Sequence, residues 1–309
     1  MSDKEIALLA RQDSLDVAID LNGYTENARP KIFAYRAAPI QINYLGYPGT
    51  MGANFMDYII ADRYLIPTDK QHFYTEKPIY LPHHYQAQDD SLRIADQSPS
   101  KLELGLPEEG FVFCAINSSY KITPREFDIW MSLLKKVERS VLWLLDFKKG
   151  TKENLMNEAI ARGVNPSRLV FAKYTSHEKY LAQFRQADLF LDTFNYNAGA
   201  TASNALWVEL PVLTKSGESY TSRMAGSLLS SIGLNNLITD TEEEYEKVAL
   251  DLATNPDRLS NIRNELEKNK LSKPLFKTQL FIDHLEKGYI QAYQNYLKGQ
   301  NPQAIFVPC

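Results

Sequence analysis

The residues best suited to chemistry lie in a short polar turn that carries Lys121. An apolar run, Phe111 to Ile116, precedes the turn and predicts a buried strand. Thr123-Pro124-x-Glu126 follows it, which combines an N-cap residue, a proline at the first helical position and an acid in the first turn. The start of a helix offers free N–H groups and the positive end of its dipole, so this turn suits a phosphate. The alternative is that Lys121 is a solvated loop lysine.

A second segment combines small residues with hydroxyl groups. Ala198 to Ser203 follows the apolar run that ends at Asp192, and Thr201 and Ser203 supply the hydroxyls. Small side chains at the start of a helix let the backbone approach a ligand, so this turn suits a phosphate or a sugar. The alternative is a tight strand-to-helix turn whose small residues serve packing only. No Gly-Lys-Ser/Thr follows, so the segment is not a P-loop.

Two further glycine turns leave similar alternatives open. Gly217 to Leu229 places serine and threonine near a helix start, which fits either a ligand site or an ordinary capped helix. Gly46 to Gly52 holds three glycines and a proline. This loop fits either a contact with a bound sugar or a structural turn.

Metal and nucleophile chemistry have little support in the sequence. The five histidines (His72, His83, His84, His177 and His284) show none of the paired spacings typical of metal ligands. His83 and His84 are adjacent, and neighbouring residues of a strand point to opposite faces. No Gly-x-Ser-x-Gly elbow is present. We therefore expect no metal site, and a bound diphosphate would be neutralised by Lys121 and helix dipoles.

Composition argues against several classes of protein. The chain has 309 residues, a net charge of −4 and a pI near 5.8, whereas a duplex nucleic-acid binder would normally carry a basic surface. No run of about 18 apolar residues predicts a membrane helix. Cys114 and Cys309 form neither a disulfide framework nor a metal motif, and no signal peptide is recognisable, so we expect a cytoplasmic protein. The length suits two domains.

Alternating strands and helices position these turns. Continuous apolar strands separated by helices indicate a parallel sheet covered on both faces, and hence a doubly wound α/β domain. In open parallel sheets, ligands bind beyond the carboxyl ends of the strands. The Lys121 turn, the turn after Asp192 and the turn from Thr214 to Thr221 are therefore expected to converge. The expected strands are 111–116, 140–145, 169–172, 188–192 and 211–214, and the expected helices are 124–137, 152–162, 177–186 and one starting at 201.

The first hundred residues predict a thinner α/β lobe. Strands are expected at 15–21, 40–45 and 57–61 with a short helix at 29–35, and the polar stretch 86–107 is expected to be a linker. From Thr241 to Lys298 the pattern is helical, with helix starts at Thr241 and Asn255. We expect a partial N-terminal lobe (1–105), a C-terminal lobe (106–280), and a C-terminal helix and tail (281–309) that pack back on the first lobe.

Several motifs along the chain occur together in one known family. They are Asp20-Leu-Asn-Gly-Tyr-Thr25, Arg36-Ala-Ala-Pro-Ile-Gln41, Leu45-Gly-Tyr-Pro-Gly-Thr50, Tyr120-Lys121-Ile-x-Pro124, Ser140-Val-Leu-Trp-Leu-Leu145, Asp192-Thr193 with Leu206-Trp207, and Ser272-x-Pro274-Leu-Phe276. In this order, and over essentially the whole chain, they resemble the catalytic region of the O-linked N-acetylglucosamine transferases, a family that includes the SPINDLY-like proteins.

The resemblance implies a GT-B fold with two Rossmann-like lobes, the first of them incomplete, and a closing C-terminal helix. It implies an inverting transfer of N-acetylglucosamine from UDP-N-acetylglucosamine to a Ser or Thr hydroxyl of a polypeptide, without metal or cofactor. Lys121 would stabilise the leaving diphosphate, and Tyr120 would line the sugar. The implied donor-binding positions are Leu45, Gly46, Tyr47, Pro48, Asn117, Ser118, Thr175, His177, Tyr180, Gly199, Ala200, Thr201 and Asn204.

Several of these positions depart from the animal enzymes of the family. Gly199-Ala200-Thr201 stands where they have His-Thr-Thr, and Asn204 stands where an aspartate holds the ribose. Tyr180 replaces a histidine that lies against the uracil, and His177 replaces a lysine. Asn204 can still hydrogen-bond a hydroxyl, and Tyr180 keeps a stacking face. The sugar and base therefore stay open, with GDP-fucose, the donor of SPINDLY-like members, as the alternative.

The family's first lobe begins well upstream of the motif at Asn22, and tetratricopeptide repeats usually precede that lobe. The chain therefore resembles a truncated member of the family. A nucleotide-sugar-binding module without catalysis is an alternative to an active transferase, as is a fragment that folds only when an upstream chain completes the sheet. Asp13 and Asp16 are candidate catalytic bases, and both also fit plain solvated acids.

Overall fold

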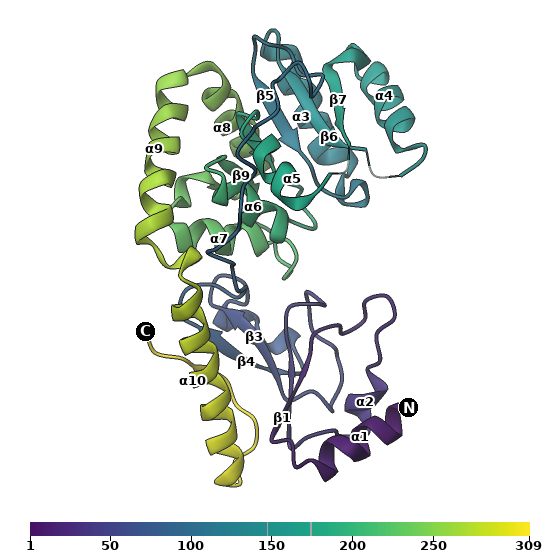
Figure 1. Cartoon of the computed structure of the whole chain (residues 1–309), viewed down its shortest axis with the longest axis vertical. Coiled ribbons are helices and arrows are strands. Elements are labelled where there is room, and N and C mark those ends of the chain that lie inside the picture. The colour runs from purple at the N-terminus through teal and green to yellow at the C-terminus, as the bar shows by residue number, and fades with distance from the viewer. Residues whose placement is uncertain (147, 174) are drawn as a thin grey trace. The chain divides into compact units, whose positions relative to one another are not determined.

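The computed structural model describes residues 1–146, 148–173 and 175–309, which divide into two compact units. The first unit combines Met1–Gln88 with Lys277–Cys309, and the second is Asp89–Phe276 (Figure 1). Each unit is built around one parallel sheet, so the α/β fold class predicted from the sequence is confirmed. Within the described ranges, we find no helix that is long and apolar enough to cross a membrane.

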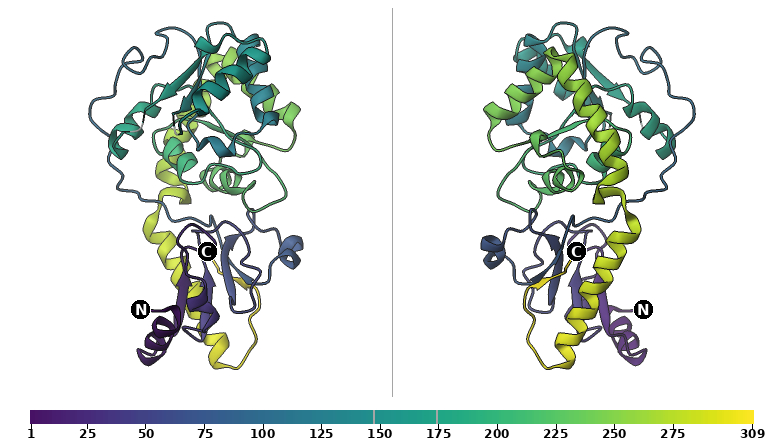
Figure 2. Two further views of the ribbon diagram at one scale, coloured as in Figure 1. Left: turned by 90° about the vertical axis from the view of Figure 1, so that its right-hand side faces the viewer. Right: turned by 90° about the vertical axis from the view of Figure 1, so that its left-hand side faces the viewer.

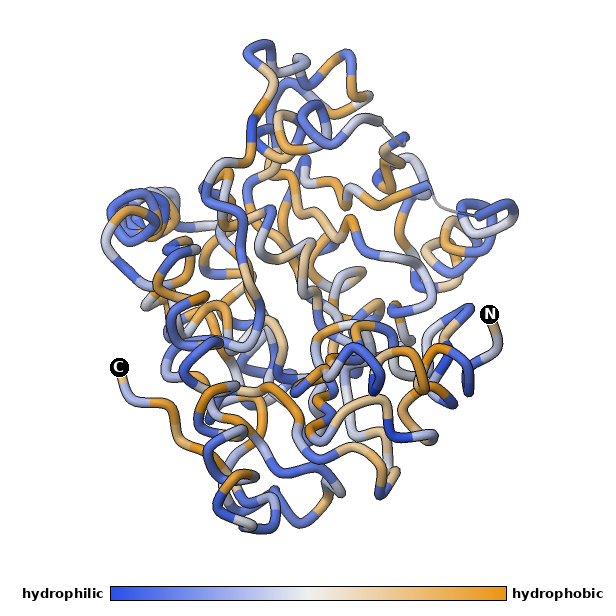
Figure 3. The backbone as a smooth tube through the Cα atoms, turned by 60° about the horizontal axis from the view of Figure 1, so that its bottom comes forward, coloured by the Kyte–Doolittle hydropathy of each residue, from blue (hydrophilic) through white to orange (hydrophobic). Residues whose placement is uncertain are grey.

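The described part of the second unit forms a six-stranded sheet in the order β10-β9-β8-β5-β6-β7. Its strands are continuous apolar runs, because helices cover both faces of a doubly wound sheet; the hydrophobic segments are orange in Figure 3. The five predicted strands are confirmed to within a residue at each end, while the two-residue β10 was not predicted. The bounds are β5 (Val112–Ala115), β6 (Val141–Leu145), β7 (Leu169–Ala172), β8 (Leu189–Leu191), β9 (Val212–Lys215) and β10 (Ile238–Thr239).

The strand order places a switch point between β5 and β8. The chain runs outward from β5 through β6 to β7, returns to β8 on the other side of β5, and continues to β9 and β10. At such a point the connections after the two central strands leave in opposite directions, which opens a crevice at their carboxyl ends. Lys121 follows β5, and the turn 193–199 follows β8. The fold therefore brings both turns to the crevice.

The helices of the second unit begin at the N-cap signals found in the sequence. Thr123 and Glu126 form a capping box, and the Thr241 and Asn255 side chains accept hydrogen bonds from the first turns of their helices. The helices are α3 (Pro124–Lys136), α4 (Thr151–Ala161), α5 (His177–Phe184), α6 (Ala200–Trp207), α7 (Met224–Ile232), α8 (Glu242–Thr254) and α9 (Pro256–Ser272), with short 3-10 turns η2 (Ser119–Lys121), η3 (Pro166–Arg168), η4 (Asn235–Leu237) and η5 (Pro274–Phe276). Helix α3 packs against α8, and α6 packs against α7 and β9.

The first unit has a five-stranded parallel sheet among its described residues, in the order β1-β2-β3-β4-β11. Helix α1, strand β4 and strand β11 were not predicted, whereas the other strands and the short helix were. The bounds are β1 (Val17–Asp20), β2 (Ile40–Asn43), β3 (Tyr58–Asp62), β4 (Lys77–Leu81) and β11 (Ile305–Phe306), with α1 (Asp3–Gln12), α2 (Lys31–Ala34), the 3-10 turn η1 (Thr68–Phe73) and α10 (Thr278–Leu297).

Helix α10 covers this sheet, as its yellow ribbon in Figure 2 shows. Phe281 and Ala292 of the helix share one apolar cluster with residues of β2, β3 and β4. Gly288 allows the close approach, since a Cβ there would lie 2.7 Å from the Ile79 side chain. The tail after the helix then adds β11 to the edge of the sheet, with Ile305 opposite Ile79.

The break between the units lies inside the polar stretch expected as a linker, but near its start. Residues 89–105 group with the second unit. The reason is a set of hydrogen bonds from this segment: Ala95 N–H donates to the Glu178 carbonyl, and the Trp207 indole N–H donates to the Leu92 carbonyl at 3.2 Å. The second break, after Phe276, falls just before α10.

Candidate functional site

Three turns distant in sequence meet at the switch point of the second unit. The Lys121 ammonium donates to the Asn197 carbonyl at 3.0 Å. Asn197 N–H in turn donates to the Thr221 carbonyl at 2.9 Å, and Thr221 Oγ1 donates to the Asn195 carbonyl at 2.8 Å. The convergence predicted for these turns is therefore confirmed. A cation stands beside the backbone that leads into α6.

Asp192, at the end of β8, shapes the turn that Lys121 contacts. Its side chain is 0% exposed, and its Oδ1 accepts hydrogen bonds from Thr193 N–H (2.9 Å) and Ala198 N–H (2.7 Å). Its Oδ2 accepts from Thr214 Oγ1 at 2.7 Å. One carboxyl group thus joins both ends of the turn to β9. Sequence reasoning missed this role, although an acid that directly follows a buried apolar strand was the signal for it.

The charges of Asp192 and Lys121 are linked. Burial raises the pKa of Asp192 to about 7, while its hydrogen bonds and the Lys121 ammonium act in the opposite direction. Burial also lowers the pKa of Lys121, and the Asp192 carboxylate opposes that shift. The ammonium is therefore partly removed from water, where its attraction to an anion is less screened than on an open surface.

The start of α6 provides the second element suited to an anion. Gly199 occupies the N-cap and has no side chain to satisfy the first N–H groups of the helix. Ala200, the first residue of the helix, is exposed, and Thr201 is half-buried. Free N–H groups and the positive end of the helix dipole are thus available beside the small residues, as the sequence suggested.

A pocket of about 260 Å³ lies at the carboxyl ends of β5, β6 and β7. It brings together five of the predicted donor-binding residues. The His177 and Tyr180 rings lie nearly parallel on α5, with centroids 6.3 Å apart and an interplanar angle of 24°. An apolar wall with hydroxyl groups and rings at its rim suits a planar base with an attached sugar. The five residues are Ser118, Thr175, His177, Tyr180 and Thr201.

Four lining residues of this pocket were not predicted. Ile116, Leu145, Ala172 and Lys173 all stand at or just after the end of a strand. Their common signal in the sequence was this position, since the strand ends themselves were predicted to form the ligand edge. Lys173 adds a lysine to the lining of the pocket.

The remaining predicted residues of the second unit do not line this pocket. Tyr120 is 66% exposed, and Lys121 points to the 193–199 turn. Asn117 is only 3% exposed, and neither atom of its amide has a hydrogen-bond partner among the described residues, although its neighbours Ile116 and Ser118 line the pocket. A buried amide of this kind is available to a bound ligand. The others outside the lining are Gly199, Ala200 and Asn204.

The predicted residues Leu45, Gly46, Tyr47 and Pro48 follow β2 in the first unit, and their contact with a donor stays a prediction. The loop is tightly built. A Cβ at Gly46 would lie 1.7 Å from the Leu21 carbonyl oxygen, which explains the glycine. The buried carboxylate of Glu76 accepts from Met51 N–H at 2.6 Å and from the Thr50 hydroxyl. The loop is therefore fixed to the body of its own unit.

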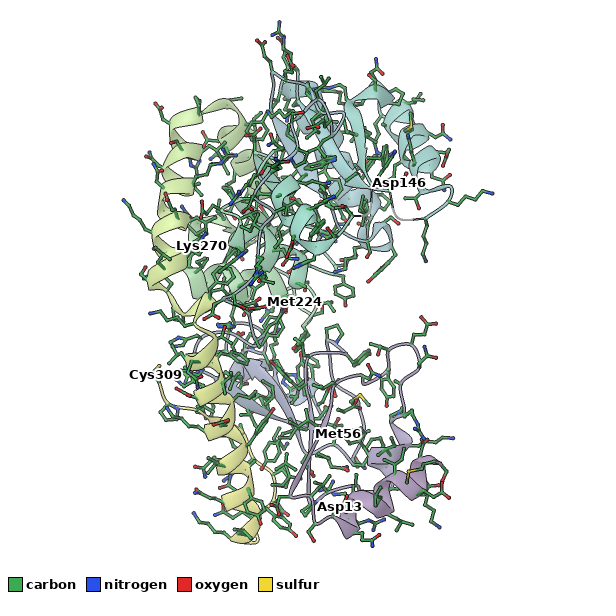
Figure 4. The ribbon with its side chains drawn as sticks, viewed as in Figure 1. Asp13, Met56, Asp146, Met224, Lys270 and Cys309 are labelled. Atoms are coloured by element: carbon green, nitrogen blue, oxygen red, sulfur yellow. The ribbon has the colours of Figure 1, made fainter. Side chains whose placement is uncertain are left out.

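The two candidate bases, Asp13 and Asp16, lie before the first strand of the first sheet. Asp13 caps the C-terminus of α1, where Figure 4 labels it, and Asp16 also precedes β1. Asp16 forms a hydrogen bond with the Tyr293 hydroxyl, which raises the pKa of that tyrosine. Ligands bind at the carboxyl ends of parallel strands, and these acids stand at the amino end of β1. A role for Asp13 or Asp16 as the catalytic base therefore has no support from this position and stays a prediction.

Metal ligands do not gather in the part of the chain that the structure describes: no three His, Cys, Asp or Glu side chains come together there in a way that could hold an ion. His83 and His284 face each other with ring centroids 5.4 Å apart, and His84 packs on Phe281. His83 and His84 follow β4 and do not lie in a strand, and their rings pack against different residues.

Two α/β units, each built on a parallel sheet, are the architecture of the GT-B class of glycosyltransferases, and the fold of this chain is of that class. The chain is a member of glycosyl transferase family 41, whose model matches residues 3–97 and 97–285. The family expected from the sequence motifs is therefore confirmed.

Relatives and a solved structure agree with this membership. A probable UDP-N-acetylglucosamine–peptide N-acetylglucosaminyltransferase SEC of Arabidopsis thaliana is 36% identical over 98% of this chain and 32% of the relative. A probable enzyme of the same kind, SPINDLY of Eustoma exaltatum subsp. russellianum, is 29% identical over 98% of this chain and 33% of the relative. A mutant O-GlcNAc transferase of Thermobaculum terrenum superposes with a TM-score of 0.88 at 28% identity, over 97% of this chain and 57% of that one. The chain thus spans about a third of the length of these curated relatives.

Proposed function

We propose that the chain transfers N-acetylglucosamine from UDP-N-acetylglucosamine to Ser or Thr hydroxyls of proteins, with inversion at the anomeric carbon and without a metal ion. The observation that carries the proposal is the contact of the Lys121 ammonium with the Asn197 carbonyl, which holds a cation beside the turn into α6. Family 41 membership and the names of the relatives support the choice of donor and acceptor.

The proposed reaction makes a negative charge that this site is suited to receive. The hydroxyl oxygen of the acceptor bonds to the anomeric carbon while the bond from that carbon to the diphosphate oxygen breaks. The electron pair leaves with the diphosphate, and the hydroxyl proton passes to a base. Donors that are already in place where charge develops stabilise the transition state more than the ground state. Lys121 and the uncapped start of α6 would act in this way.

The substitution Lys121→Met tests this role, because it removes the charge and keeps an unbranched side chain. We expect kcat to fall by about 10²–10³-fold, the usual loss for one donor to a developing charge, with a smaller change in KM. The control is Lys268→Met, since Lys268 is exposed on α9 and does not line the pocket. A Lys121→Met variant that keeps most of its turnover contradicts the proposal.

The identity of the donor is tested by thermal unfolding in the presence of UDP, UDP-N-acetylglucosamine, GDP and GDP-fucose. All three tryptophans (Trp130, Trp143 and Trp207) lie in the second unit, so their fluorescence follows the unit that holds the pocket. A nucleotide present at 100 times its Kd stabilises by about 2.7 kcal/mol. We expect the uridine compounds to protect. Protection by the guanosine compounds alone would favour a protein O-fucosyltransferase.

The length of the chain relative to its relatives favours a second candidate, a nucleotide-sugar-binding module that does not catalyse transfer. A transfer assay on a Ser/Thr-rich peptide with the protecting nucleotide sugar separates the two functions. Sugar on the peptide supports the transferase. Protection from heat without any transfer supports the module, and adding the upstream region of a relative should then restore transfer.

A further inference from the structure

The ammonium of Lys121 lies against an aromatic ring to which the sequence analysis gave no role. Its Nζ is 3.9 Å from the centroid of the Tyr196 ring, while it donates to the neighbouring Asn197 carbonyl at 3.0 Å. A cation over the face of a tyrosine at this distance is attracted by the negative face of the ring. Two contacts of different kinds therefore meet on one ammonium, and both come from adjacent residues of the same turn.

The turn holds Tyr196 from both sides. Thr193 Oγ1 donates to the Tyr196 carbonyl at 2.7 Å, and Asn197 Nδ2 donates to the Thr193 carbonyl at 2.6 Å. The Tyr120 ring meets the Tyr196 ring edge to face, with centroids 6.2 Å apart and an interplanar angle of 65°. The backbone on either side of Tyr196 is thus fixed, so the ring is the rigid partner and the lysine the flexible one.

We propose that Tyr196 is a positioning residue for Lys121: its ring face and the Asn197 carbonyl together hold the ammonium at the turn into α6. An ammonium has three N–H donors, and this arrangement leaves at least one of them for an anion at the start of the helix. Asp192 supplies the nearby negative charge, and the Tyr120 ring meets the Tyr196 ring edge to face. The inference rests on the role proposed for Lys121 in transfer, and it adds Tyr196 as the residue that positions the Lys121 ammonium.

Three substitutions separate the effect of the aromatic ring of Tyr196 from the effect of its side-chain size. Tyr196→Phe keeps the ring face and removes only the hydroxyl. Tyr196→Leu keeps an apolar side chain but has no ring, and Tyr196→Met is a second ring-less variant in case the first does not fold. Tryptophan fluorescence of the second unit reports whether each variant is folded.

The readout that does not need activity is the reactivity of Lys121 itself. Competitive acetylation of the full chain over a range of pH, followed by mass spectrometry, gives the pKa of individual lysines. Removing the ring while the site stays buried should destabilise the ammonium and raise its free-amine fraction at pH 8 by about threefold to tenfold, whereas Tyr196→Phe should match the wild type. Lys215, whose Nζ lies 5.4 Å from the Phe194 ring in the same region, is the internal reference and should not change.

The second readout is transfer kinetics. The ring-less variants should lose about fivefold to twentyfold in kcat with little change in KM, and Tyr196→Phe should retain the wild-type rate. Equal Lys121 reactivity in the ring-less, Phe and wild-type chains overturns the positioning role. A changed Lys121 reactivity in a chain that transfers no sugar supports the positioning role and counts against the proposed function instead.

Discussion

Replacing Asp192 by asparagine should change how the stability of the second unit depends on pH. The carboxyl group is fully buried and accepts from Thr193 N–H, Ala198 N–H and the Thr214 hydroxyl. The amide of Asp192→Asn can keep these three contacts, because its oxygen accepts two hydrogen bonds and its NH₂ group can donate to the hydroxyl oxygen. The variant therefore removes an ionisable group with little change in packing.

The size of the effect follows from the raised pKa. The pKa of Asp192 rises from an ordinary 3.8 to about 7, so between these values the folded chain binds a proton that the unfolded chain has released. The stability of the wild type then falls as pH rises through this interval, by up to about 1.4 kcal/mol per pH unit. Asp192→Asn lacks this dependence. Relative to the wild type, its free energy of unfolding should therefore increase by up to about 4 kcal/mol as pH rises through the interval, and should not increase further above it.

Urea unfolding followed by tryptophan fluorescence measures this difference in the second unit alone, because all three tryptophans lie there. The matched control is Glu265→Gln, which removes an acid that is exposed on α9. If the stability difference between Asp192→Asn and the wild type is the same at pH 5 as at pH 7, the reasoning about the buried carboxyl group is refuted.

The remaining predictions concern the loop 45–52 of the first unit. Gly46→Ala should destabilise this unit by about 2 kcal/mol or more, because the new Cβ would lie 1.7 Å from the Leu21 carbonyl oxygen. Gly49→Ala, with its nearest neighbour at 3.6 Å, should be tolerated, and amide hydrogen exchange in β1 and β2 compares the two. Glu76→Ala should cost about 1–3 kcal/mol and speed the exchange of Met51 N–H, which loses its acceptor; unchanged exchange at Met51 would count against that anchor.

The elements that could be predicted are those whose pattern is local. Each strand of the second sheet except β10 is an apolar run between helix signals, so its place and its neighbours followed from the sequence. Strand β4 was missed because Pro78 interrupts its pattern and only a 3-10 turn precedes it. Strand β11 was missed because its partner lies more than 200 residues away. Helix α1 had a readable signal, the capping box of Ser2 and Glu5.

The residues of the candidate site also differ in how far the sequence indicates them. Lys121 could be proposed from the sequence because a lysine between a strand end and a helix start is well placed to bind an anion. Asp192 carried a signal that was missed, its position directly after a buried apolar strand, whereas Tyr196 could not be predicted because its importance lies in contact with Lys121, more than 20 positions away. A tyrosine in a turn gives no indication in the sequence of which side its ring faces. The hydroxyl and ring residues of the pocket came from the resemblance to the family, while its apolar wall follows from where the strands end.

The chain returns to its first sheet after completing the second, and this order matters during synthesis. Everything between Asp89 and Phe276 is contiguous, so that portion can condense as soon as it leaves the ribosome. The earlier portion must wait, with the apolar side of β2 and β4 uncovered, until Lys277–Cys309 emerges with α10 and β11. Translation that stops after Phe276 would therefore release a folded second unit joined to an incomplete first unit with exposed apolar surface.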